Sequence, residues 1–190
     1  MPAFSTIDKN RNHHWAVVGL GRAGNIRLRN LRADPQLGAL TLCSRRDQSH
    51  PSFAQVLHDK SVTGVFLCRE SENHSGDARQ ALSAGKHVLV EYPLAFTKTE
   101  GVELYELARQ VGCVLHVGFL GLLHGWSADV SKILKQNQVH SAHYDFRAGF
   151  GGVPQSDADG GRLGVMVLSR IQQLIAWFGH LELVRCSMNE

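Results

Sequence analysis

The chain has 190 residues, of which 43% are hydrophobic and 19% charged, with a net charge of +3. This length allows one complete domain and part of another, and the apolar content is sufficient for a hydrophobic core. The small net charge, and basic residues that are not interleaved with aromatic ones, argue against a nucleic-acid-binding protein.

Several further classes are disfavoured by the pattern of residues. No apolar run has the length of a membrane span, so we expect no membrane partner. Residues 1–14 are polar and lack the apolar centre of a signal peptide, and we predict a flexible tail there. The four cysteines are widely spaced and the eleven histidines form no H-x-x-x-H pair with an acidic neighbour. We therefore predict reduced thiols, a cytoplasmic location and no metal site.

A glycine-rich turn follows the first predicted strand, Trp15–Leu20. It has the G-x-G-x-x-G spacing and leads into a predicted helix over Arg22–Arg32. In such a turn the first glycine allows the sharp bend, the second lets a pyrophosphate approach, and the third lets helix and strand pack closely. The helix N-terminus then attracts the phosphates. The alternative is an ordinary strand-to-helix turn. We assign cofactor contacts to Gly19, Gly21, Arg22, Ala23 and Gly24.

The second predicted strand, Leu40–Cys43, ends at Ser44-Arg45-Arg46. A domain that binds NAD usually carries Asp or Glu at this point to hold the ribose 2′-hydroxyl. Here a hydroxyl and two guanidinium groups replace the carboxylate, and this combination suits the 2′-phosphate of NADP. The alternative is a solvated basic turn. We predict NADPH as the cofactor, with NADH also possible.

From Ser52 to Val117 the chain continues to alternate between helix and strand. Alternation of this kind predicts an α/β fold, a Rossmann-type doubly wound parallel sheet over residues 15–120, with ligands at the carboxyl ends of its strands. Helices are predicted over Ser52–His58, Asn73–Ala84 and Lys98–Val111, and strands over Val62–Cys68, His87–Val90 and Cys113–Val117.

After Gly118 the alternation stops. Residues 121–190 are predicted to begin an α+β domain with a mostly antiparallel sheet, a partial substrate-binding domain. The expected elements are a helix over Gly121–Gln136, a strand over His140–Arg147, a loop over Gly149–Gly161, a helix over Leu163–Phe178 and a strand from Leu181 to Ser187.

The stretch from Ala84 to Glu91, followed by Pro93, resembles the signature of the glucose–fructose oxidoreductase/inositol dehydrogenase superfamily. The glycine turn and His74 support this resemblance. Within the superfamily the chain is most similar to the biliverdin reductase family over residues 15–187. The residues that carry this closer similarity are Ser44-Arg45-Arg46, Glu70-Ser71, Tyr92, Val114-Leu115-His116 and Ser169-Arg170.

The resemblance implies an NAD(P)H-dependent oxidoreductase of heme catabolism that reduces biliverdin to bilirubin. Hydride would pass from NADPH to the central methine bridge of this small-molecule substrate. Ser71, His74, Glu91 and Tyr92 would then contact the cofactor, and Glu91, Tyr92 and Arg170 would be catalytic. Arg170 would hold a propionate or supply a positive field, whereas Tyr92 would donate a hydrogen bond or only form an aromatic wall.

Two departures from the family patterns keep alternatives open. Sugar-oxidising members carry lysine where this chain has Tyr92, and Asp and His where it has Val165 and Ser169, so a sugar or polyol dehydrogenase is disfavoured. The biliverdin reductase pattern has a pair of glutamates where Val117-Gly118 stand. A catalytically weak or inactive NAD(P)-binding regulatory relative therefore remains the alternative, and the oligomeric state stays open.

Overall fold

The structure, a computed structural model, describes residues 13–34, 37–145, 157–182 and 184–185. The chain divides into two compact units, Met1–Gly118 and Phe119–Glu190. They are described one after the other. The sequence analysis places a domain boundary after residue 120, and this domain boundary stays a prediction.

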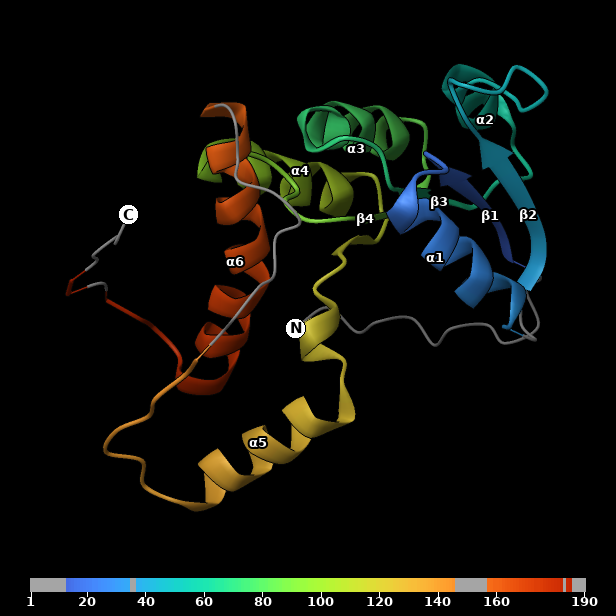
Figure 1. The fold of residues 1–190 in the computed structure, drawn as a ribbon. Coiled ribbons are helices and arrows are strands. Elements are labelled where there is room, and N and C mark those ends of the chain that lie inside the picture. Colours follow the sequence, from blue (N-terminus) through green and yellow to red (C-terminus); the bar gives the residue numbers. More distant parts are fainter. Residues whose placement is uncertain (1–12, 35–36, 146–156, 183, 186–190) are drawn as a thin grey trace. The chain divides into compact units, whose positions relative to one another are not determined.

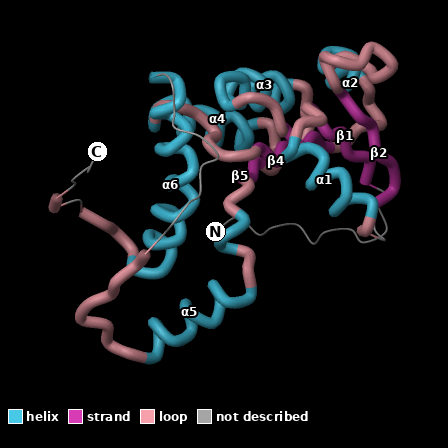
Figure 2. The backbone as a smooth tube through the Cα atoms, viewed as in Figure 1, coloured by secondary structure: helices cyan, strands magenta, loops and turns pink. Residues whose placement is uncertain are grey.

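The described part of the first unit contains a five-stranded parallel sheet with the strand order β2-β1-β3-β4-β5 (Figures 1 and 2). The fold class predicted for this part of the chain is therefore confirmed. The strands are β1 (His13–Val18), β2 (Leu37–Cys43), β3 (Gly64–Leu67), β4 (His87–Val90) and β5 (Leu115–Val117).

Helices cover both faces of this sheet. Figure 1 shows α1 on one side and α2, α3 and α4 on the other, as right-handed crossovers require for this strand order. The chain leaves β1 toward β2 and then returns to β3 on the other side of β1, so the carboxyl ends of β1 and β3 flank the switch point where ligands bind in such sheets. The helices are α1 (Arg22–Arg32), α2 (Phe53–His58), α3 (His74–Ser83) and α4 (Lys98–Gln110), with a short 3-10 turn η1 (Ser71–Asn73) before α3.

The central strands are apolar because both of their faces are covered. On β1, Val17 and Val18 are fully buried, as is Val90 on β4. Trp15 packs edge-on against Phe66 of β3 with ring centroids 4.9 Å apart. A side chain at Gly64 would overlap the Trp15 ring, so the strand begins with a residue that leaves room for it.

Capping residues define the helix ends. Ser52 and Gln55 form a reciprocal capping box at the start of α2, and Thr97 accepts the backbone N–H of Glu100 at the start of α4. Gly85 and Gly112 follow α3 and α4 with positive φ values of 72° and 70°, which glycine adopts without strain.

The predicted elements of this unit are all present with small shifts at their ends. One shift is informative: β1 begins at His13, inside the predicted tail, because Thr63 N donates to the carbonyl of His14 at 2.8 Å and extends the sheet. Residues 1–12 of that tail lie outside the described residues.

The described part of the second unit is helical, with a 3-10 turn η2 (Leu120–Leu122), α5 (Gly125–Gln136) and α6 (Asp157–Phe178). The fully buried amide of Gln173 on α6 donates to the carbonyl of Gly121 at 3.0 Å. Trp177 of α6 donates to the hydroxyl of Ser127 on α5 at 3.3 Å. These bonds fix α6 to both earlier elements. No helix among the described residues combines the length and apolar character needed to cross a membrane.

Three predictions for the second unit need correction. The predicted strand 140–147 has no regular structure over residues 140–145, because alternation alone does not make a strand without a partner strand to supply its hydrogen bonds; residues 146–147 lie outside the described set. The predicted loop 149–161 is helical from Asp157, since adding residues to an existing helix costs little. Of the predicted strand 181–187, the described residues 181–182 and 184–185 are irregular.

Candidate functional site

The loops that follow β1, β2 and β3 meet at the carboxyl edge of the sheet. They enclose a hollow of about 470 Å³. The sheet order places β1 between the other two strands, so their loops become neighbours although they are far apart in sequence. The hollow is lined by Gly19, Leu20, Gly21, Ser44, Arg45, Arg46, Asp47, Cys68, Arg69 and Glu70.

The three glycines of the turn have different surroundings. Gly19 has a φ of +94°, and an added Cβ would lie 2.8 Å from the carbonyl oxygen of Cys68. A Cβ on Gly24 would collide with the carbonyl oxygen of Gly19. Gly21 is the opposite case, since a Cβ there would meet no atom within 4 Å. The first and third glycines are thus needed by the fold, whereas Gly21 faces open space in which a phosphate can approach the backbone.

Helix α1 begins directly at this space. Its N-cap residue is Gly21, which has no side chain to accept the first N–H groups, and its first turn contains no acidic residue. Those N–H groups and the positive end of the helix dipole favour an anion. Arg22 and Ala23 form the first turn of α1, and their contact with a cofactor stays a prediction.

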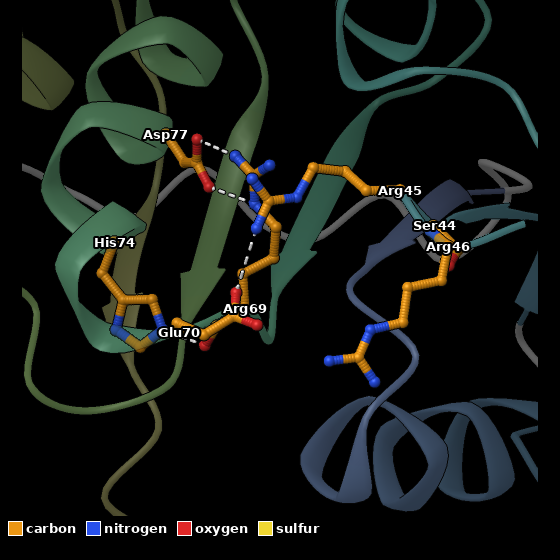
Figure 3. A network of polar contacts seen from close by, with 7 residues as sticks. All are labelled: Ser44, Arg45, Arg46, Arg69, Glu70, His74 and Asp77. Carbon is orange, nitrogen blue, oxygen red and sulfur yellow. Dashed lines mark hydrogen bonds and ion pairs between the residues drawn. The ribbon is translucent and has the colours of Figure 1, made fainter.

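The predicted phosphate clamp lies at the other end of the hollow. The Ser44 hydroxyl accepts a hydrogen bond from the backbone N–H of Arg46 at 3.2 Å, which closes a tight turn after β2. Arg45 and Arg46 are exposed. Arg45 Nη2 lies 3.4 Å from Glu70 Oε2 across the hollow. Figure 3 shows Arg45 extending toward Glu70 while Arg46 extends in another direction.

A third arginine of the hollow, Arg69, was not identified from the sequence. It directly follows the apolar run of β3, and a charged residue at a strand's carboxyl end was the available signal. Its guanidinium donates in a fork to the carboxylate of Asp77 on α3, with Nε 2.7 Å from Oδ2, and its Cζ lies 5.2 Å from the centre of the Phe53 ring. Both contacts hold Arg69 in place at the wall of the hollow, and Figure 3 shows the one with Asp77.

Of the residues predicted to lie near the nicotinamide, His74 is fully enclosed. Its ring nitrogens lie 2.8 Å from the carbonyl oxygen of Pro93 and 2.9 Å from that of Arg69. The ring therefore joins the loop after β3 to the loop after β4. Ser71 begins the turn η1 between Glu70 and this histidine. Direct contacts of Ser71 and His74 with a cofactor stay predictions.

Glu91, at the end of β4, forms an ion pair that the sequence did not reveal. Arg27 on α1 donates through Nε to Glu91 Oε1 at 2.7 Å, and its Nη2 lies 2.6 Å from the same oxygen. The side chains are only 9% and 16% exposed. Gly118 leaves room for the pair, because a Cβ there would lie 3.3 Å from Arg27 Nη2. Arg27 thus fixes the position of the Glu91 side chain.

The other two predicted catalytic residues lie in different units. Tyr92 is half-buried in the loop after β4 and precedes Pro93 through a cis peptide bond. Arg170 is half-buried on α6 of the second unit, where a Cβ on Gly121 would lie 3.8 Å from its Nη1. Their shared role in one reaction stays a prediction.

Burial disfavours the thiolate form of the two cysteines near the hollow. Burial raises the pKa of Cys68 to about 12, and burial also raises the pKa of Cys43. Both are free cysteines and keep their protons at neutral pH. Over the described ranges, no group of three or more His, Cys, Asp or Glu side chains gathers as a metal site would require.

Comparisons with known proteins identify related oxidoreductases. Human biliverdin reductase A is 34% identical over 193 residues, which cover 96% of this chain and 64% of that protein. A dTDP-3,4-didehydro-2,6-dideoxy-alpha-D-glucose 3-reductase of Saccharopolyspora spinosa is 30% identical over 107 residues, covering 56% of this chain and 32% of that enzyme. The chain thus spans about 64% of the length of the biliverdin reductases that it matches.

Among solved structures, the biliverdin reductase of Synechocystis sp. PCC 6803, in complex with biliverdin and NADP+, matches with a TM-score of 0.74 and 28% identity. This match covers 91% of the present chain and 60% of that one. A 3-ketoreductase from Actinomadura kijaniata, in complex with TDP-benzene and NADP, matches with a TM-score of 0.60 and 25% identity over 66% of this chain and 44% of that one.

A family profile described as an oxidoreductase family with an NAD-binding Rossmann fold matches residues 13–119. This segment contains the whole parallel sheet, the glycine turn and the hollow above it. The chain therefore belongs to this oxidoreductase family, the GFO/IDH/MocA family.

Proposed function

We propose that this chain binds NADPH in the hollow of the first unit and supplies the cofactor domain of a biliverdin reductase. The observation that carries the proposal is that the hollow joins an open glycine turn at a helix N-terminus to a hydroxyl and two exposed guanidinium groups. The first feature fits a pyrophosphate and the second fits a 2′-phosphate. The similarity to biliverdin reductases over 96% of this chain supports the choice of substrate.

When bound, NADPH supplies a hydride for the central methine bridge of biliverdin, and protonation of a pyrrole nitrogen completes bilirubin. The chain's own residues bind and orient the cofactor. The N–H groups at the start of α1 hold the pyrophosphate, while Ser44, Arg45 and Arg46 hold the 2′-phosphate. Arg27 fixes the position of Glu91, so this side chain shapes the proposed nicotinamide side of the site.

On the substrate side, we propose that Arg170 binds a propionate of biliverdin and that the Tyr92 hydroxyl donates a hydrogen bond near the reacting bridge. A guanidinium is a strong anion clamp and a poor acid, so the proton comes through bound water. Free thiols at Cys43 and Cys68 are consistent with a reducing compartment, and we propose a cytoplasmic location.

The second candidate is an NAD(P)-binding protein that does not turn over biliverdin. It is favoured by two residues at the end of β5, Val117 and Gly118, where the family resemblance calls for glutamates. Val117 is buried, and Gly118 packs against the ion pair of Arg27 and Glu91, so neither position offers a carboxylate to a bilin. A sugar reductase has less support, because Tyr92 stands where those enzymes carry lysine.

The two candidates are separated by one experiment on the purified chain. NADPH is titrated while nicotinamide fluorescence is followed, and biliverdin is then added while bilirubin absorbance is recorded. Saturable binding with bilirubin formation supports the reductase. Binding without bilirubin supports the second candidate, and no binding contradicts both.

A further inference from the structure

Two acidic residues, Asp47 and Glu70, line the hollow, and Glu70 is the one paired with an arginine of the predicted phosphate clamp. Its carboxylate lies 3.4 Å from Arg45 Nη2, and both side chains line the hollow. A hydrogen bond from its own backbone N–H lowers the pKa of Glu70 most, and the charges of the three arginines Arg45, Arg46 and Arg69 lower it further. Glu70 is therefore a carboxylate surrounded by the positive charges that an incoming anion would use.

The three arginines are not equally available to a ligand. Arg69 is occupied by Asp77 in a forked ion pair and is largely buried. Arg45 is paired with Glu70, but their side chains are 66% and 57% exposed, so this pair separates at little cost. For Arg46 no ion pair is found within the described part of the chain. A 2′-phosphate thus meets Arg46 directly and must compete with Glu70 for Arg45.

We propose that Glu70 is a cofactor-specificity residue that weakens binding of the 2′-phosphate and thereby narrows the preference of this hollow for NADPH over NADH. The carboxylate occupies Arg45 as an internal anion and repels the phosphate. A ribose 2′-hydroxyl carries no charge and can donate a hydrogen bond to the same carboxylate. This inference rests on the proposed function, because it requires the adenosine end of the cofactor to lie in this hollow.

The test uses two fragments that differ only in the 2′-phosphate, 2′,5′-ADP and 5′-AMP, titrated by calorimetry into the full chain and into Glu70→Gln. The variant keeps the side-chain shape and removes the charge at an exposed position. We expect the dissociation constant of 2′,5′-ADP to fall about 3- to 10-fold, from removal of one like charge near a phosphate in a wet site. The constant for 5′-AMP should change by less than about 2-fold.

The matched control is Glu72→Gln. Glu72 is exposed in η1, the turn that directly follows Glu70, and it does not line the hollow. It should leave both constants unchanged. Its comparison with Glu70→Gln separates local competition from a general change in net charge.

Each outcome decides the inference. Tighter 2′,5′-ADP binding by Glu70→Gln alone supports it. An unchanged or weaker constant overturns it, as does an equal gain for both fragments, while the proposed function survives if the wild-type chain binds 2′,5′-ADP. If the wild-type chain binds neither fragment nor NADPH, the proposed function fails and the inference fails with it.

Discussion

Arg27 on α1 and Glu91 at the end of β4 form a largely buried ion pair, with Nε and Nη2 of the guanidinium both directed at Oε1. The pair links α1, whose N-terminus faces the proposed phosphate site, to the loop after β4 that carries Tyr92. Removing one partner leaves an uncompensated charge in a space that water reaches poorly, and such a loss costs far more than the intact pair contributes.

Arg27→Met is therefore expected to lower the free energy of unfolding by about 3–5 kcal/mol. The double variant Arg27→Met/Glu91→Leu removes both charges and should recover most of this loss. Urea denaturation followed by circular dichroism measures both values. Arg29→Met, an exposed position on the same helix, is the control and should stay within about 0.5 kcal/mol of wild type. Equal losses in the single and double variants would contradict the pairing argument.

The phosphate clamp makes a separate prediction. Arg45→Ala combined with Arg46→Ala should weaken NADPH binding by about 2–3 kcal/mol and leave NADH binding nearly unchanged, because charge-assisted bonds to the 2′-phosphate are lost. Fluorescence titration with each nucleotide measures the difference. Arg32→Ala, exposed at the far end of α1, should affect neither nucleotide. Equal weakening for both nucleotides would rule out a 2′-phosphate clamp at this position.

The parts of this site that the sequence revealed are those encoded locally. The glycine spacing after an apolar run, and the two arginines after the next run, each lie within a few residues of a strand end. A parallel sheet then brings the strand ends together without further information. The sequence thus predicts that Gly19, Gly21, Arg45 and Arg46 contact one cofactor, and these four residues line one hollow in the structure.

The pairs formed between distant elements were not accessible from the sequence. Arg27 and Glu91 are 64 residues apart, and their pairing depends on how α1 lies against the sheet. The error at residues 140–145 has a related cause, since their alternation fits a strand only if a neighbour supplies hydrogen bonds. The hydrophobic periodicity of a segment shows which of its faces is apolar, but it does not show which other element packs against that face.

Alanine substitutions of the turn glycines should separate effects on stability from effects on NADPH binding. Gly24→Ala should lower the free energy of unfolding by about 1–3 kcal/mol or prevent folding, because the new methyl group collides with the Gly19 carbonyl. Gly21→Ala places its methyl group in open space, so it should stay within about 0.5 kcal/mol of wild type in stability. It should nevertheless weaken NADPH binding, because the methyl group stands where the pyrophosphate approaches.

Thermal denaturation and nucleotide titration of the same two samples measure these effects. Gly76→Ala is the control, since it also has open space for a Cβ but lies on α3 away from the lining of the hollow. It should bind NADPH like wild type. Unchanged NADPH binding by Gly21→Ala would contradict placing the pyrophosphate at this turn.

The raised pKa of the buried Cys68 thiol predicts how the free energy of unfolding changes at alkaline pH. Burial raises its pKa to about 12 from 9.0, with the Glu91 charge adding to the rise and Arg27 opposing it. Above pH 9.0 the unfolded thiol loses its proton while the folded one keeps it, so the unfolded state binds fewer protons and the free energy of unfolding falls as pH rises. Below that pH both states are protonated, and the group adds no pH dependence.

For one thiol, we expect the free energy of unfolding to fall by about 1.4 kcal/mol per pH unit within this pH range. Urea denaturation of wild type and Cys68→Ala at about pH 8, 9.5 and 10.5 isolates the contribution of the Cys68 thiol, because the two proteins share all other titrating groups. Their stability difference should be constant up to about pH 9 and then shift in favour of the alanine variant. Cys113→Ala is the control, since Cys113 is less buried and its removal should change the slope less. A difference independent of pH would mean that the Cys68 thiol ionises as readily in the folded chain as in the unfolded one.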